Sequence, residues 1–153
     1  MLRNSTLKRS TPLRAKAPMK RGAAKLPAKR KTARPTKTMY RNPELLKLAK
    51  GMPCKLAIPG VCCGDMKTVV ACHSNQSRHG KAGWLKAHDW ATAWGCRTCH
   101  HYIDQSRLPS YDEKTALWEA GFRETRLSLI ALGKWPHEAE IGYMTVYGAG
   151  HGE

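Results

Sequence analysis

Two pairs of cysteines place the strongest constraint on how this chain can fold. Cys96 and Cys99 form a C-x-x-C pair, and Cys54 and Cys62 lie on either side of a Pro59-Gly60 turn. Two such pairs, each on a turn and a few dozen residues apart, are typical of zinc knuckles in a four-thiolate site. The segment that contains them has few large apolar side chains, so a tetrahedral zinc can replace part of a missing core. We predict a structural Zn²⁺ held by these four thiolates.

Other uses of the cysteines stay open from the sequence. A redox role for the C-x-x-C pair is one alternative, although the thioredoxin-like βαβ pattern that normally carries it is missing. Cys63 could take the place of Cys62, and Cys72 is expected to be a buried thiol. The N-terminus has no apolar secretory segment, which favours a reducing compartment and metal ligands over disulfides. No run of residues is apolar enough for a membrane span, so we expect no membrane association.

The charge of the chain is concentrated at its N-terminal end. The whole sequence of 153 residues carries 27 Lys+Arg against 11 Asp+Glu, a formal net charge of +16, and the first 41 residues hold 14 of the basic residues and no acid. This segment is punctuated by proline and is too poor in apolar residues to fold alone. We predict a disordered arm, residues 1–41, that binds DNA phosphates without reading sequence. Its candidate contacts are Lys8, Arg9, Arg14, Lys20, Arg21, Lys29, Arg30 and Lys31.

Residues 42–135 are expected to form the folded domain, of the α+β class. A short helix should begin at Asn42, and two strands are expected over 68–71 and 91–94, followed by a helix that starts near Cys99. A C-terminal amphipathic helix is predicted over 110–132, with Ser110 and Glu113 forming a capping box. Its expected apolar face consists of Ala116, Leu117, Ala120, Leu127 and Ile130. The Gly-rich segment 136–153 is expected to be a flexible tail.

Three residues around the cysteine pairs suggest a second, catalytic metal site. On a helix, His100 and Asp104 are i and i+4, so one face presents an imidazole and a carboxylate that can bind one cation. His73 follows the first predicted strand, where a neutral histidine could take a proton from an attacking water. A bound Mg²⁺ or another divalent cation could then stabilise a phosphate undergoing hydrolysis.

The order Cys54…Cys62…His73…Cys96-x-x-Cys99-His100 resembles zinc-containing HNH endonucleases, whose fold is a small ββα-metal domain. Cys54-x7-Cys62 with Ile58-Pro59-Gly60-Val61, Ala91-Thr92 and Cys96-x-x-Cys99-His100-x-x-Ile103-Asp104 is more closely similar to the YbcO family of prophage nucleases. The likeness covers residues 42–133. It implies that His73 is the general base, that His100 and Asp104 are metal ligands, and that the four cysteines bind structural zinc.

One position departs from the wider HNH pattern. The asparagine that orients the base histidine would fall on Ala91, so Asp89 is the candidate to replace it or to bind the metal. His101 and His79 are alternative metal ligands, and His88 is expected in solvent. Trp84 is the best candidate for an exposed tryptophan, whereas packing is expected for the other three near the site. The positive rim for phosphates is predicted to comprise Arg78, Lys81, Lys86, Arg97 and Arg107.

These residues favour a metal-dependent DNA endonuclease with a role in phage recombination or DNA processing in the cytoplasm of a bacterial host. A zinc-stabilised module that binds nucleic acid without cutting it is the main alternative. Recombination proteins are further candidate partners, and a homodimer through the helix 110–132 is left open.

Overall fold

The computed structural model describes residues 38–148 of the chain, so the tail lysines and arginines up to residue 37 lie outside the described residues. In chain order the elements are α1 (Pro43–Lys47), the 3-10 turn η1 (Met66–Thr68), β1 (Val70–His73), the 3-10 turn η2 (Ser77–His79), β2 (Thr92–Gly95), α2 (Arg97–Gln105), α3 (Tyr111–Ala131) and α4 (His137–Tyr147). The predicted α+β class is confirmed. None of the described helices is both long and apolar enough to cross a membrane.

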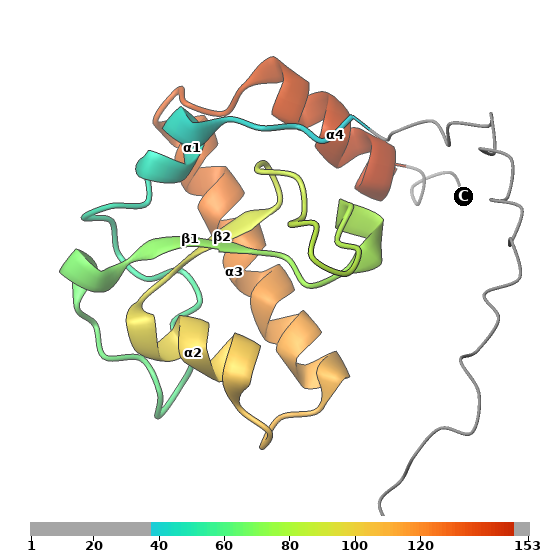
Figure 1. The fold of residues 1–153 in the computed structure, drawn as a ribbon. Coiled ribbons are helices and arrows are strands. Elements are labelled where there is room, and N and C mark those ends of the chain that lie inside the picture. Colours follow the sequence, from blue (N-terminus) through green and yellow to red (C-terminus); the bar gives the residue numbers. More distant parts are fainter. Residues whose placement is uncertain (1–37, 149–153) are drawn as a thin grey trace, which may run out of the picture. The chain divides into compact units, whose positions relative to one another are not determined.

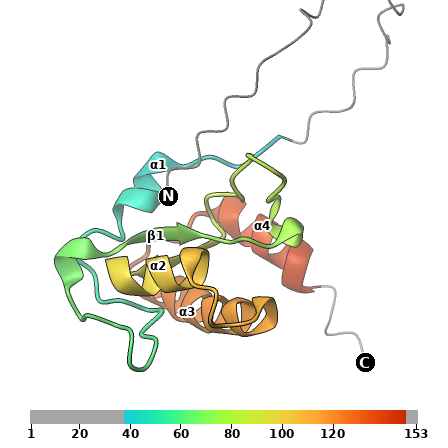
Figure 2. The same ribbon diagram turned by 60° about the horizontal axis from the view of Figure 1, so that its bottom comes forward.

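A two-stranded hairpin forms the centre of the domain. β1 and β2 are antiparallel, with Val70 opposite Gly95 and His73 opposite Thr92. Figure 1 shows α3 crossing behind the hairpin, and Figure 2 shows α2 in front of α3 and below β1. All four residues of β2 are buried, because α3 packs against this strand. The hairpin therefore presents mainly β1 to the solvent side, where the first candidate histidine ends the strand.

The long helix α3 has the predicted start but buries a different face. Ser110 accepts a hydrogen bond from the Glu113 amide while the Glu113 carboxylate accepts one from the Ser110 amide, so the predicted capping box is present. The predicted apolar face is wrong, since Ala116, Ala120, Leu127 and Ile130 are exposed and Leu117 is half-buried. The buried positions are Trp118, Glu119, Gly121, Phe122, Thr125 and Leu129.

Small residues decide which face of α3 turns inward. A Cβ on Gly121 would lie 3.1 Å from the Lys55 carbonyl oxygen and 3.1 Å from Leu56 Cα, so the glycine lets the 55–56 backbone pack against the helix. The backbone N–H groups of Lys55 and Leu56 both donate to the Trp94 carbonyl at the end of β2. Residues 52–58 are thus held between hairpin and helix as irregular backbone.

The C-terminal segment is ordered as far as the structure describes it. Residues 137–147 form α4, so the prediction of a flexible tail over 136–153 is wrong for this part, and residues 149–153 lie outside the described region. Three aromatic rings account for the helix, since Tyr143 and Tyr147 stack on each other and both contact Phe122 of α3. A Cβ on Gly142 would clash with the Trp90 ring, so α4 also packs closely on the indole.

Candidate functional site

The four predicted cysteines converge on one point. The Sγ atoms of Cys54, Cys62, Cys96 and Cys99 all lie within 4.8 Å of one another, and all six cysteines are free thiols. The Cys62 and Cys96 sulfurs are 3.8 Å apart. Tetrahedral zinc with Zn–S bonds of about 2.3 Å needs neighbouring sulfurs roughly 3.8 Å apart. The donor set and its spacing therefore fit a four-thiolate metal centre.

Hydrogen bonds favour the charged form at two of these sulfurs, whereas burial raises the pKa of Cys99. The backbone N–H groups of Ala57 and Cys96 donate to Cys54 Sγ at 3.4 and 3.2 Å. Burial raises the pKa of Cys96, but hydrogen bonds from Thr98 and from backbone N–H groups outweigh it and lower the pKa to about 5. A thiolate is the form that a metal binds.

The two remaining cysteines lie outside this cluster. Cys63 is exposed, and Cys72 is buried in the hairpin, where burial raises the pKa of its thiol. Cys62 and not Cys63 thus completes the set of four. The raised pKa keeps the Cys72 thiol protonated, which is not the form of a reactive cysteine.

His73 is paired with a buried carboxylate. Its Nε2 lies 3.0 Å from Asp89 Oδ1, and the two side chains are 18% and 4% exposed. An ionised carboxylate can only accept, so Nε2 carries a hydrogen, and in the neutral form of the ring the lone pair is therefore on Nδ1. Nδ1 has no hydrogen bond or ion pair to any residue among 38–148. The geometry thus leaves the second ring nitrogen of His73 able to accept a proton.

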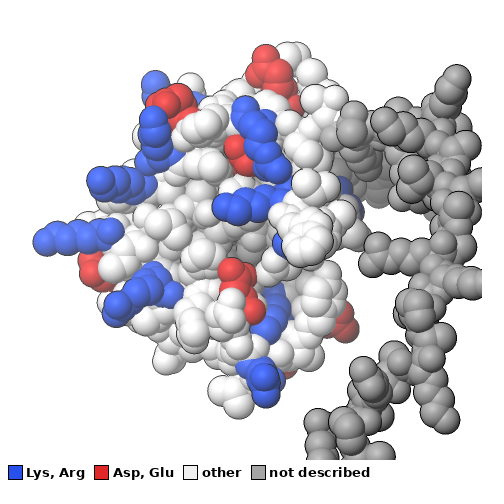
Figure 3. All heavy atoms as spheres, in the orientation of Figure 1, with Lys and Arg blue, Asp and Glu red and all other residues white. Residues whose placement is uncertain are grey.

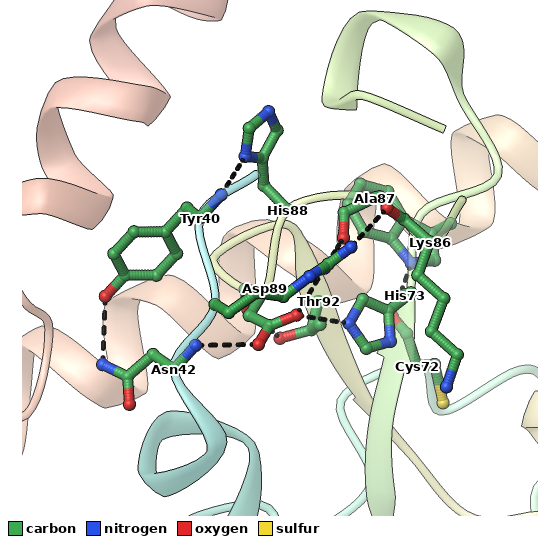
Figure 4. Close-up of polar contacts among 11 residues, drawn as sticks. Tyr40, Asn42, Cys72, His73, Lys86, Ala87, His88, Asp89 and Thr92 are labelled. Atoms are coloured by element: carbon green, nitrogen blue, oxygen red, sulfur yellow. Dashed lines mark hydrogen bonds and ion pairs between the residues drawn. The ribbon is translucent and has the colours of Figure 1, made fainter. Parts of the chain in front are cut away.

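Asp89 is itself fixed by the segment that precedes α1. Arg41 Nη1 donates to Asp89 Oδ1 at 2.8 Å, and the Asn42 amide donates to Oδ2 at 2.8 Å (Figure 4). Burial alone would raise the pKa of Asp89. The hydrogen bonds from His73 and from residues 41–42 outweigh it and hold the pKa below its usual value. Asp89 is therefore a charged hydrogen-bond partner that fixes the orientation of the His73 ring.

Arg41 is a residue of this site that the sequence reasoning missed. It was assigned to the disordered arm, whereas its guanidinium donates to the Ala87 and Lys86 carbonyls as well as to Asp89. The adjacent Tyr40 amide donates to His88 Nδ1, so His88 is a packed residue and its expected place in solvent is wrong. The sequence does not reveal that Arg41 belongs to the folded domain, because it lies in a run of basic residues. The residue that pairs with it, Asp89, is 48 positions later in the chain.

His100 and Asp104 share one face of α2, as their spacing predicts. His100 Nε2 lies 3.0 Å from Asp104 Oδ2, and Asp104 Oδ1 accepts a hydrogen bond from Asn75 Nδ2 at 2.9 Å. The hydrogen bond to Asp104 raises the pKa of His100. Burial raises the pKa of Asp104, but hydrogen bonds from His100 and Asn75 lower it below its usual value. Asn75, two residues after His73, is a further site residue with no signal in the sequence motifs.

The two histidine–carboxylate pairs remain separate. Within the part of the chain that is described, the only group of three or more His, Cys, Asp or Glu ligands is the four-cysteine cluster. His100, Asp104 and Arg97 line an open hollow of about 510 Å³ on α2. His73 lines a different one, between α1 and β1. The chain that links the pairs is short, because only Ser74 separates His73 from Asn75.

The predicted phosphate rim is only partly available. Arg97 lines the hollow beside His100, and Arg107 is exposed between α2 and α3. Arg78 is neutralised by an ion pair with Glu119 and lies over the Tyr147 ring. Lys81 Nζ donates to the Gly83 carbonyl of its own loop.

The two alternative histidine ligands have different positions. His79 is fully buried, between Ser74 Oγ at 2.7 Å and the Tyr147 hydroxyl at 2.9 Å. It belongs to the core and lies in none of the ligand groups found, so the alternative that it binds the metal is wrong. His101 is exposed on α2 and lines the same hollow as His100.

These elements define the class of protein. It is an α+β domain with a cluster of four cysteines and with histidine–carboxylate pairs at its hairpin and on its helix. The family model described as "Putative nuclease YbcO" matches residues 43–134, which is more than half of the chain. The chain belongs to the YbcO family of putative nucleases.

One solved structure is similar to the chain. It is a putative bacteriophage protein from Escherichia coli str. K-12 substr. MG1655, with 25% sequence identity and a TM-score of 0.46. The match covers 57% of this chain and 96% of the other. None of the curated proteins compared with the chain matches it.

Proposed function

We propose that this chain is a metal-dependent endonuclease of the HNH type that hydrolyses DNA phosphodiester bonds. The observation that carries the proposal is the hydrogen-bonded pair of His73 and Asp89, fixed at the end of β1 by Arg41. A histidine held by a buried carboxylate, with one ring nitrogen left to accept a proton, is the arrangement of a general base. The hairpin followed by α2 is the ββα unit in which HNH enzymes carry their site.

His73 accepts the proton of an attacking water at Nδ1, and Asp89 stabilises the imidazolium that forms. Because Arg41 and the Asn42 amide compensate the Asp89 charge, the carboxylate stays ionised while it holds the ring. This arrangement fixes both the tautomer and the orientation of the base. A positioned general base contributes about 10²–10⁴-fold to rate.

His100 and Asp104 are the proposed ligands of a divalent cation such as Mg²⁺. An imidazole nitrogen and two carboxylate oxygens on one helix face are a donor set that such an ion accepts. When bound, the cation would supply Lewis-acid stabilisation to the scissile phosphate and its leaving oxygen. Asn75 fixes the orientation of the Asp104 carboxylate through its hydrogen bond to Oδ1.

The four cysteines are proposed to hold a structural Zn²⁺. The C-x-x-C pair lies where β2 passes into α2, since Cys96 caps the helix and Cys99 is buried in its first turn. Zinc there would fix the helix that carries His100 and Asp104 relative to the hairpin that carries His73. The metal would then contribute to the geometry of the site without taking part in the chemistry.

A supercoiled-plasmid nicking assay in Mg²⁺ and in Mn²⁺ tests the enzyme. We expect nicking by the wild type, and loss of about 10²-fold or more of the rate in His73→Ala and in His100→Ala. His137→Ala is the matched control, because His137 is exposed at the start of α4.

Two results would refute parts of the proposal. If the protein binds DNA but nicks it neither with Mg²⁺ nor with Mn²⁺, the non-catalytic binding module is favoured. In that case the hydrogen bond between His100 and Asp104 is purely structural. Equal rates for the wild type and His73→Ala would remove the assignment of the base.

A further inference from the structure

The hollow beside His73 carries a cluster of lysines that the predicted rim did not contain, apart from Lys86. It has a volume of about 470 Å³ and lies between α1 and β1. Its apolar lining includes Leu46, Val69 and Ala71. Four ammonium groups, from α1 and the turn after it, from η1 and from the loop before Asp89, surround this lining: Lys47, Lys50, Lys67 and Lys86.

Three of these lysines form no ion pair within the described residues. Lys47 forms an exposed i,i+3 ion pair with Glu44 at 2.7 Å, whereas Lys50, Lys67 and Lys86 have no ion pair among residues 38–148. Figure 3 shows the basic side chains gathered on the left of this face, over α1 and η1. In Figure 4 the Lys86 side chain runs beside the His73 ring. An apolar lining with a positive rim matches the sugars and phosphates of a nucleic-acid strand.

The loop that supplies Lys86 also exposes an aromatic side chain. Trp84 is 99% exposed, whereas Trp90, Trp94 and Trp118 are 1–3% exposed. Ala82 and Leu85 form an antiparallel bridge, so Trp84 projects from the tip of a closed turn and not from a loose segment. A fully exposed indole is unusual, since tryptophan is highly buried on average. Such an indole loses the most exposed apolar surface when a flat apolar group stacks on it.

We infer that this surface binds a single DNA strand, with its phosphates along Lys50, Lys67 and Lys86 and one base stacked on Trp84. The inference rests on the proposed function for the choice of DNA and adds the substrate form. A positive groove that follows the backbone, next to an aromatic platform for bases, is the arrangement that binds single strands without sequence preference. Stacking on the indole needs a base whose flat face is open. In duplex DNA these faces are covered by the neighbouring bases of the stack. Because the groove includes His73, the bound strand passes the proposed base.

Fluorescence anisotropy of a labelled oligo-dT and of a duplex of equal length tests the inference. The full-length, zinc-loaded protein is used without added Mg²⁺ or Mn²⁺, across a range of NaCl concentrations. The triple variant K50Q/K67Q/K86Q is compared with K55Q/R123Q/K134Q, which removes the same charge outside the groove. Each phosphate contact to a single strand contributes about 0.7 to the slope of log K against log salt. We expect the groove variant to lose about 2 from this slope, and the control to lose much less.

Trp84 has a matched pair of variants. Base stacking contributes about 1–3 kcal/mol per base, which corresponds to roughly 5- to 150-fold in affinity. Trp84→Ala should lose this factor for oligo-dT, whereas Trp84→Phe should keep most of the affinity because it retains an aromatic face.

Several outcomes would overturn the inference. These are equal slopes for the two triple variants, wild-type affinity in Trp84→Ala, and tighter binding of the duplex than of oligo-dT. If the protein nicks no DNA but shows the expected losses, the nuclease proposal fails and the binding surface stands. If it nicks through His73 and the groove variant binds as the control does, the surface is wrong and the nuclease proposal stands.

Discussion

His79 makes the folded state sensitive to mild acid, and the structure sets the size of the effect. The ring is fully buried and packs against Trp90, Trp118 and Phe122. Ser74 donates to Nδ1, and Nε2–H donates to the Tyr147 hydroxyl, which donates onward to Glu119. This chain of hydrogen bonds suits a neutral imidazole. Burial lowers the pKa of His79 from 6.5 to about 4, although the Glu119 charge raises it.

The sign of the effect follows from the two pKa values. The pKa of His79 in the folded protein lies below that in the unfolded chain, so the unfolded chain binds the proton more tightly. Its contribution to stability is fully present above pH 6.5 and is lost as the pH falls toward 4. With these pKa values, the free energy of unfolding should fall by about 1.3 kcal/mol between pH 7.5 and 5.5 through this group alone.

Urea unfolding at several pH values in this range measures the effect. The wild type is compared with His79→Gln, whose amide can still donate and accept but does not titrate. Zinc stays in the buffer and the pH stays at or above 5.5, so that the thiolates contribute equally to both proteins. The wild type should lose about 1.3 kcal/mol more than the variant over this interval. Parallel pH curves for the two proteins would refute the assignment of a buried neutral His79.

Four further changes test other parts of the structure. Cys96→Ser should release about one zinc per chain and lower the melting temperature, measured by metal analysis and calorimetry, whereas Cys63→Ser should do neither because Cys63 is outside the cluster. Asp89→Ala should lower the nicking rate by about 10²-fold with unchanged DNA affinity, since it removes the carboxylate that orients His73 and stabilises its imidazolium, and loss of affinity instead would indicate a binding role. Gly142→Ala should destabilise the fold by about 1–3 kcal/mol in urea unfolding, because its Cβ would meet the Trp90 ring, while Gly148→Ala, where only the flexible Met144 side chain is close, should cost much less. Deleting residues 1–37 should flatten the salt dependence of DNA binding without unfolding the domain, and an unchanged slope would mean that the arm does not bind phosphates.

Features that depend on short sequence separations could be predicted. The i,i+4 pair of His100 and Asp104, the capping box of Ser110 and Glu113, and the C-x-x-C pair each follow from helix or turn geometry within five residues. The two strands were found within one or two residues of their observed limits for the same reason. Alternation and β-branched residues are local signals.

The buried face of α3 differs from the predicted one. Apolar character does not predict which face is buried where two backbones approach closely. Gly121 faces inward to admit Leu56, and Thr125 faces inward because its hydroxyl accepts from the Trp94 amide. Leu127 and Ile130 are left exposed instead. The spacing of large apolar residues does not predict the buried face of a helix when a glycine and a hydroxyl group determine that face. The homodimer through this helix stays a prediction, and these exposed side chains are where it would form.

The site depends on the helix that sequence reasoning left out. Tyr147 of α4 links Glu119 of α3 to His79, and His79 accepts from Ser74. Ser74 stands between His73 and Asn75, which belong to the two histidine–carboxylate pairs. The backbone that joins the two pairs is therefore anchored at Ser74 by a hydrogen-bond chain that reaches Tyr147, 68 residues downstream of His79. No local pattern encodes such a chain, because each of its members has an ordinary role when read alone. Through this chain α4, which carries none of the proposed catalytic groups, helps to hold the segment between His73 and Asn75 in place.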